Sequence, residues 1–187
     1  MLLGLLPIYS LSQGFGGGPS LAINFSQVDG DGVGGYKKLG LNLGGFVYYS
    51  FNDKIALQPE ILFSQKGARE VNETMAWNFR ANYFDVPVIL RITALEKNFG
   101  KLIAEVGPSF GYLINAKRGL APIIQNVTPE YNKLSYEFHA GFGFRFPQGL
   151  MVSIRHSTSF INFRPNYYPR LFWHRYISIM LRYDLKK

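Results

Sequence analysis

The sequence predicts an all-β protein, an eight-stranded, antiparallel, up-and-down transmembrane β-barrel. Three observations support this fold: alternation of apolar and polar residues, alternation of short and long connections, and balanced charge on the polar faces. The alternation is clearest over residues 134–146, where every even position is apolar or aromatic and every odd position is charged, polar or glycine. A strand turns successive side chains to opposite faces, and a membrane-spanning barrel turns its apolar face to lipid and its polar face inward.

Composition limits the class of protein. With 187 residues, 47% of them hydrophobic and 17% charged, the chain fits one folded domain and not a disordered protein. No apolar run reaches the roughly 18 residues of a transmembrane helix. Cysteine is absent, which excludes a disulfide scaffold, an iron–sulfur site and a thiol nucleophile. The net charge of +8 is dispersed, so it favours outer-membrane lipid and lipopolysaccharide as partners and no nucleic acid.

The first residues are typical of the end of a secretory signal peptide. An apolar core is followed by small residues at Ser10 and Ser12, which predicts cleavage before Gln13. We therefore expect residues 1–12 to be a residual signal peptide and residues 13–187 to form the barrel domain. An ordinary apolar N-terminal strand is the alternative.

Eight segments alternate with a period of two, and each is long enough to cross a bilayer as a tilted strand of about 9–11 residues. The first four segments are 20–28, 39–51, 55–66 and 82–93. Their lipid-facing residues are expected to be, segment by segment, Leu21, Ile23 and Phe25; Leu41, Leu43, Val47 and Tyr49; Ile55, Leu57, Ile61 and Phe63; and Phe84, Val86, Val88, Leu90 and Ile92. The last four segments are 102–115, 134–146, 150–161 and 175–185. Their lipid-facing residues are expected to be, segment by segment, Val106, Phe110 and Tyr112; Phe138, Phe142 and Phe144; Val152, Ile154 and Phe160; and Ile177, Ile179, Leu181 and Tyr183. Rings near the strand ends are expected to form interfacial girdles: Tyr48, Tyr49, Tyr83, Phe84, Phe144, Phe146, Tyr176 and Tyr183.

The connections alternate in length. Segments 50–54, 94–100 and 147–149 are short, whereas 29–38, 67–81, 116–133 and 162–174 are long. Outer-membrane barrels have short periplasmic turns and longer external loops. The pattern therefore predicts a bacterial outer-membrane location with both chain termini in the periplasm and the long loops extracellular.

The polar faces carry nearly balanced charge. The acids expected to point inward are Glu60, Asp85, Glu105, Glu137 and Asp184, and the bases are Lys66, Arg91, Arg145, Arg155 and Arg182, with His139 among them. Charges held away from bulk water must be paired, and eight strands leave an interior just wide enough for side chains. We expect a lumen filled by its own ion-pair network; solvated charges on a soluble sheet are the alternative.

Three prolines fall inside predicted strands. Pro59, Pro87 and Pro108 lie at similar heights on neighbouring strands, where each removes a ladder hydrogen bond. They predict a local seam of weakened pairing or bulges. The alternative is that each proline occupies a position that donates no ladder bond.

Several strand segments are similar to a known family. Residues 56–67 (ALQPEILFSQKG), 83–90 (YFDVPVIL) and 106–113 (VGPSFGYL) resemble the porin-like outer-membrane β-barrel domain family, which includes PorT-type proteins, and residues 23–26 (INFS) resemble its first strand. The resemblance implies a small Gram-negative outer-membrane barrel, some relatives of which assist protein secretion. The chain departs from a common outer-membrane pattern because it ends in Leu185, Lys186 and Lys187 and not in an aromatic residue.

We expect a non-enzymatic barrel with a structural or interaction role at the envelope, of which a secretion accessory is one form, with no cofactor and no metal site. The candidate binding patch in the last long loop consists of Arg164, Tyr167, Tyr168, Arg170, Phe172 and Trp173. A loop folded over the barrel mouth as a lid is the alternative.

Two other functions stay open. A narrow channel for small solutes is the second reading, and a lipid-A-modifying enzyme with His139 as base and Glu137 or Glu105 to orient it is the third. The segment 29–32 (DGDG) is similar to a calcium loop but lacks the remaining ligands, so a glycine-rich hairpin loop explains it better.

Overall fold

The computed structural model describes residues 14–30, 35–71, 76–120, 123–164 and 172–186. Its strands are β1 (Phe15–Asp29), β2 (Lys38–Ser50), β3 (Ile55–Val71), β4 (Ala76–Lys97), β5 (Gly100–Leu120), β6 (Ile123–Asn126), β7 (Leu134–Arg145), β8 (Leu150–Ser159) and β9 (Trp173–Tyr183), with one 3-10 turn, η2 (Thr128–Glu130). The residues predicted as a signal peptide, 1–12, lie outside the described part of the chain. No helix among the described residues is long and apolar enough to cross a membrane.

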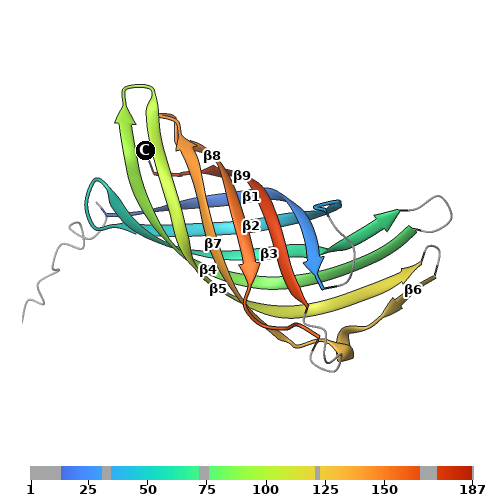
Figure 1. The fold of residues 1–187 in the computed structure, drawn as a ribbon. Helices are drawn as coiled ribbons and strands as arrows, with labels where there is room; N and C mark the ends of the chain where they lie inside the picture. The colour runs from blue at the N-terminus through green and yellow to red at the C-terminus, as the bar shows by residue number, and fades with distance from the viewer. Residues whose placement is uncertain (1–13, 31–34, 72–75, 121–122, 165–171, 187) are drawn as a thin grey trace, which may run out of the picture.

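Eight strands close into a ring. The order is β4-β3-β2-β1-β9-β8-β7-β5, and β5 pairs again with β4 to complete the circle (Figure 1). Every pairing along the ring is antiparallel. The predicted eight-stranded antiparallel barrel is therefore confirmed, and β6 is an additional strand that pairs with β5 outside the ring.

The two ends of the barrel differ. The short-turn end carries the connections 51–54, 98–99 and 146–149 together with the start of β1 and the end of β9 (Figure 1). At the 146–149 turn the backbone of Gly149 has φ +91°, a conformation that favours glycine. The opposite end, called the long-loop end, carries the connections 30–37, 72–75, 121–122, 127–133 and 160–172.

Two segments predicted as long loops are largely strand. Residues 67–71 of β3 pair with 76–80 of β4, and 77–80 of β4 pair with 117–120 of β5. β6 then adds to the outer edge of β5, so that β3 to β6 form a sheet that projects beyond the ring at the long-loop end (Figure 1). The prediction of loops over 67–81 and 116–133 was wrong.

The phase of the residue pattern explains the error. Within the ring the inward side is polar and the outward side is apolar. In the projecting sheet the inward side is apolar, with Ala68, Phe79 and Ala116 buried, while Arg80 and Lys117 are exposed on the outward side. A sheet surrounded by water hides its apolar face, so the alternation inverts where the strands leave the lipid-facing belt.

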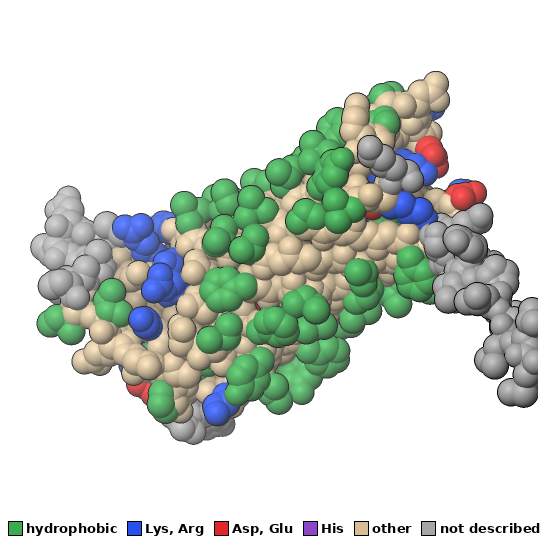
Figure 2. Space-filling model, turned by 180° about the vertical axis from the view of Figure 1, so that it is seen from behind, with side chains coloured by type: hydrophobic (Ala, Val, Ile, Leu, Met, Phe, Trp, Pro, Cys, Tyr) green, Lys and Arg blue, Asp and Glu red, His purple; other side chains and the backbone are tan. Residues whose placement is uncertain are grey.

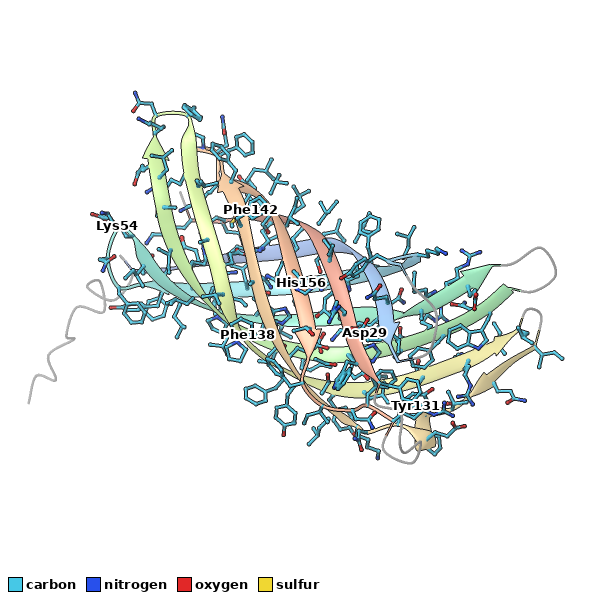
Figure 3. All side chains as sticks on the ribbon, viewed as in Figure 1. Asp29, Lys54, Tyr131, Phe138, Phe142 and His156 are labelled. Carbon is cyan, nitrogen blue, oxygen red and sulfur yellow. The ribbon has the colours of Figure 1, made fainter. Side chains whose placement is uncertain are left out.

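An apolar belt surrounds the ring. Leu43, Phe110 and Phe142 face outward with 52%, 55% and 61% of their surfaces exposed. Figure 2 shows hydrophobic side chains across the middle of the molecule, with charged side chains gathered toward both ends. Phe138 and Phe142 lie along the same wall strand in Figure 3. Large apolar side chains exposed on a closed barrel are the surface that lipid covers.

The prolines interrupt the strand pairing in a diagonal seam. Opposite Pro59 the β2–β3 ladder passes from Phe46–Glu60 directly to Tyr49–Leu57. The β3–β4 ladder has the same gap opposite Pro87, and the β4–β5 ladder has it opposite Pro108. The register is the same on both sides of each gap, and each proline keeps regular pairing with its other neighbour. The predicted seam of weakened pairing is confirmed, and it consists of missing pairs without bulges.

Candidate functional site

Four ionised side chains from four strands meet at the centre of the lumen. Arg155 of β8 makes a two-pronged contact with Glu60 of β3, Nη1 to Oε2 at 2.8 Å and Nη2 to Oε1 at 2.9 Å. Glu105 of β5 accepts from Arg155 Nη2 at 3.0 Å and from Arg182 Nη1 of β9 at 2.6 Å. All four residues are at most 2% exposed. Two acids and two bases leave this central cluster electrically neutral, as burial of charge requires.

A second cluster lies on the long-loop side of the centre. Lys66 Nζ contacts Asp85 Oδ2 at 2.7 Å and Glu137 Oε1 at 2.8 Å, and Tyr176 donates its hydroxyl to Glu137 Oε2 at 2.6 Å. Lys66 also lies 4.7 Å from the centre of the Tyr83 ring. One base therefore serves two acids here, and phenol groups complete its surroundings.

A third cluster lies on the short-turn side. Asp184 Oδ2 accepts from Arg145 Nη2 and from the Tyr48 hydroxyl, both at 2.6 Å. Arg91 stacks over the Tyr48 ring at 5.1 Å and donates to Gln58 Oε1 at 2.8 Å. Gln58 in turn donates to Glu60 Oε1 at 2.7 Å, which joins this cluster to the central one.

The predicted lumen residues therefore all point inward, and the structure brings ten of them into the three clusters: Glu60, Lys66, Asp85, Arg91, Glu105, Glu137, Arg145, Arg155, Arg182 and Asp184. The eleventh, His139, is buried beside the second cluster and lies 2.6 Å from Ser157 Oγ through its Nδ1. The backbone makes room for these chains: a Cβ on Gly111 would collide with the Asp85 carboxylate.

Three predictions of interfacial girdle residues were wrong. Tyr48, Tyr83 and Tyr176 were expected in the interfacial girdles, but they are buried inside, with 5%, 1% and 2% exposed. Each shares the parity of inward polar residues on its strand, so strict alternation would have placed it correctly. Phenol rings belong inside here because their hydroxyls and faces satisfy the buried ions.

Aromatic side chains close the long-loop end. We call Phe79, Tyr131, Phe163 and Phe172 the aromatic cap; Phe79 lies 5.2 Å from Tyr131 and 5.9 Å from Phe163, ring centre to ring centre. His174 stacks on Phe163 at 4.1 Å and meets the Tyr83 hydroxyl at 3.2 Å, so the cap rests on the second cluster. Burial raises the pKa of the Tyr131 phenol, and the nearby Arg118 and Arg164 oppose that shift.

The candidate patch in the last long loop is only partly described. Tyr167, Tyr168 and Arg170 lie outside the described residues. Phe172 is 6% exposed and belongs to the cap, and the Arg164 guanidinium lies over its ring at 5.9 Å. Trp173 is half-buried in β9 opposite Asp29. Phe172 therefore does not form part of an exposed surface, because it fills the mouth of the barrel, as the lid alternative requires.

The residues considered for catalysis lie buried among the lumen side chains. His139 and Ser157 have the contact of a base and a nucleophile, but both are buried and His139 Nε2 has no hydrogen-bond partner among the described residues. Glu137 is engaged by Lys66 and Tyr176, and Glu105 by two arginines. Within the described residues, no group of three His, Asp or Glu side chains is arranged to hold a metal ion.

Comparison with known proteins identifies the family. Residues 10–164 match the model of the outer membrane protein beta-barrel domain. The chain belongs to this family. It is therefore a protein of the bacterial outer membrane, and its ring of eight strands crosses that membrane. The more specific resemblance to PorT-type proteins stays a prediction. No curated protein matches the chain.

Solved barrels share the fold at low sequence identity. Ail, the attachment invasion locus protein of Yersinia pestis, superimposes with a TM-score of 0.56 at 16% identity, over 91% of this chain and 98% of Ail. Ail in complex with the heparin analogue sucrose octasulfate gives a TM-score of 0.54 at 14% identity, over 91% of this chain and 99% of that Ail chain. Neisserial surface protein A gives a TM-score of 0.52 at 9% identity, over 90% of this chain and 96% of that protein. These likenesses concern the fold.

Proposed function

We propose that this protein is a non-enzymatic outer-membrane barrel whose long-loop end binds anionic surface groups, above all the phosphates of lipopolysaccharide. In this proposal the short turns and both chain ends lie in the periplasm and the projecting sheet lies outside. The filled lumen supports a structural or interaction role, since its centre is occupied by paired side chains.

A basic patch on the projecting sheet carries the proposal. Arg80 of β4 is paired directly with Lys117 of β5, and both are exposed on the outward side. Arg69 of β3 is exposed on the same sheet, diagonally across from Arg80. Like charges facing each other across strands repel, so their arrangement favours a bound anion between them. We call Arg69, Arg80 and Lys117 the outer basic patch.

The position of the patch suits lipopolysaccharide. It lies on the outward side of β3 to β5, directly beyond the apolar belt, where lipid head groups meet the protein. Phosphate groups are acceptors that Arg and Lys bind well. The complex of Ail with a heparin analogue makes a sulfated glycan the second candidate ligand for the same patch.

The experiment compares two double variants of equal charge change. Arg80→Gln with Lys117→Gln removes two patch charges, and Lys97→Gln with Lys133→Gln removes two exposed charges outside the patch. Basic residues at a membrane surface contribute about 1 kcal/mol each, so the patch variant should bind purified lipopolysaccharide about 30-fold more weakly. The control should change affinity less than about threefold. Equal losses in both variants would show that only net charge matters and would overturn the proposal.

Two other functions are tested separately. Flux of small solutes through the protein in liposomes would favour the narrow channel, and mass spectrometry of lipid A with and without the gene tests a lipid-modifying enzyme. A secretion accessory of the PorT type is a narrower form of our proposal. It predicts that an envelope or secretion protein is recovered with the barrel from native outer membrane and is lost in the patch variant.

A further inference from the structure

The short-turn end contains an open vestibule. This cavity of about 550 Å³ is lined from β2, β3, β4, β5 and β7, and Arg91 is one of its buried lining residues. Lys54 on its rim and Tyr131 in the aromatic cap mark opposite ends of the barrel (Figure 3). The volume is within the range of about 300–1,000 Å³ found for small-molecule sites.

The lining of the vestibule is strongly basic. Five bases line it (Lys54, Arg91, Lys101, Arg145 and Lys186), against the single acid Asp53. Lys101 and Arg145 are paired directly across β5 and β7, which sets like charges against each other. Glu96 and Asp184 partner these two bases at 2.7 and 2.6 Å, and the bases outnumber the acids even when Lys186 is left out.

Among the described residues, Arg91 is the buried arginine that makes no ion pair with an acid. Arg91 is 7% exposed; it donates a hydrogen bond to Gln58 and stacks on the ring of Tyr48. The Nε of Arg91 is buried and has no hydrogen-bond partner in the described part of the chain. A buried guanidinium with an unused donor is costly unless an anion completes its surroundings.

We propose that the vestibule binds a phosphate group, with Arg91 as the ligating residue and with Lys101 and Arg145 at the rim attracting the anion. A phosphate group offers at least two free acceptor oxygens and about one to two negative charges at neutral pH, which suits a fork-shaped donor surrounded by further cations. The phosphate can belong to a small periplasmic solute or to a lipid head group at the barrel edge. The site is separate from the outer basic patch, which lies at the opposite end of the barrel.

The first experiment observes Arg91 itself. The wild-type protein, labelled with nitrogen-15, is placed in nanodiscs of phosphatidylcholine, and the Arg91 Nε–Hε resonance is followed while inorganic phosphate is added at constant ionic strength. The same resonance is then recorded without added phosphate in nanodiscs that contain phosphatidylglycerol. A saturable shift in either arm supports the proposal, and the arm that responds identifies the source of the phosphate. No shift in either arm, or an equal shift with acetate or chloride, overturns it.

The second experiment compares variants of equal charge. Arg91→Gln should weaken phosphate binding at least about tenfold, as the loss of a charge-assisted hydrogen bond implies. Lys97→Gln is the matched control, because it removes a charge at the same end without lining the vestibule, and it should change affinity less than about twofold. Lys101→Gln, at the half-exposed rim, should weaken binding severalfold even if the Arg91 variant fails to fold. Unchanged affinity in Lys101→Gln together with an unshifted Arg91 resonance would exclude the site.

Discussion

Glu105→Gln removes one negative charge from the central cluster while nearly preserving the shape of the side chain. Glu105 accepts from Arg182 Nη1 at 2.6 Å, from Arg182 Nη2 at 2.8 Å and from Arg155 Nη2 at 3.0 Å. In the variant, Glu60 alone faces both guanidinium groups, and its distance to Arg182 is 3.8 Å. Loss of one partner leaves a charge buried without compensation, which costs about 3–5 kcal/mol. We expect the free energy of unfolding to fall by that amount.

The measurement is reversible unfolding from lipid vesicles in guanidinium chloride, followed by the fluorescence of Trp77 and Trp173. The matched control is Glu130→Gln, which removes an acid whose side chain is 44% exposed and which bonds Arg118 and Arg164 at the long-loop end. Exposed pairs contribute about 0–1 kcal/mol, so this variant should unfold close to the wild type. The difference between the two variants isolates the effect of burial.

A second substitution distinguishes charge imbalance from lost packing. Adding Arg182→Gln to Glu105→Gln restores neutrality in the central cluster. The free energy of unfolding should therefore fall by less in the double variant than the sum of its losses in the two single variants. If Glu105→Gln instead unfolds within about 1 kcal/mol of the wild type, water reaches the cluster and screens its charges. That result would refute the reasoning that the lumen is a closed ion-pair network.

Three further predictions follow from the same geometry. Planar-bilayer recordings of the purified wild type should show no stable, large open conductance, because the central cluster fills the lumen; a steady open channel would contradict this. Phe163→Ala should loosen the aromatic cap and increase proteolysis between β6 and β7 while the ring stays folded, and unchanged protease resistance would show that the cap contributes little. Amide hydrogen exchange should be faster at the interrupted pairs around Val47 and Ile61 than at regular pairs on the same strands, and uniform protection would argue against the seam.

The ring and the inward charges could be predicted from the sequence because the membrane enforces a single rule. Outward residues meet lipid, so a period of two with apolar outward positions is visible along every strand. Glu105 and Arg155 follow this rule without exception, and their opposite charges suggest pairing. Which acid meets which base depends on the stagger between strands, which the alternation alone does not specify.

The projecting sheet and the vestibule could not be predicted in the same way. Beyond the lipid belt the apolar side turns inward, so Phe79 and Ala116 carry a pattern of the opposite phase, and the segments resemble polar loops. The vestibule arises from side chains that are distant in sequence, such as Lys54 and Arg145, and which converge only when the ring closes. The inward aromatic rings were missed because tyrosine suits both an interfacial girdle and a buried ion.

The charges of the lumen balance as a whole but not at each height, and the imbalance indicates which end is open to ligands. The central cluster is neutral and enclosed. The cluster beside the aromatic cap has an excess acid, since Lys66 serves both Asp85 and Glu137, and apolar rings separate it from the long-loop end. The excess base is Arg91, which faces the open vestibule. A buried charge without a partner of opposite sign is costly, and at the open end an anion from solution or from the membrane can reach Arg91 and compensate it.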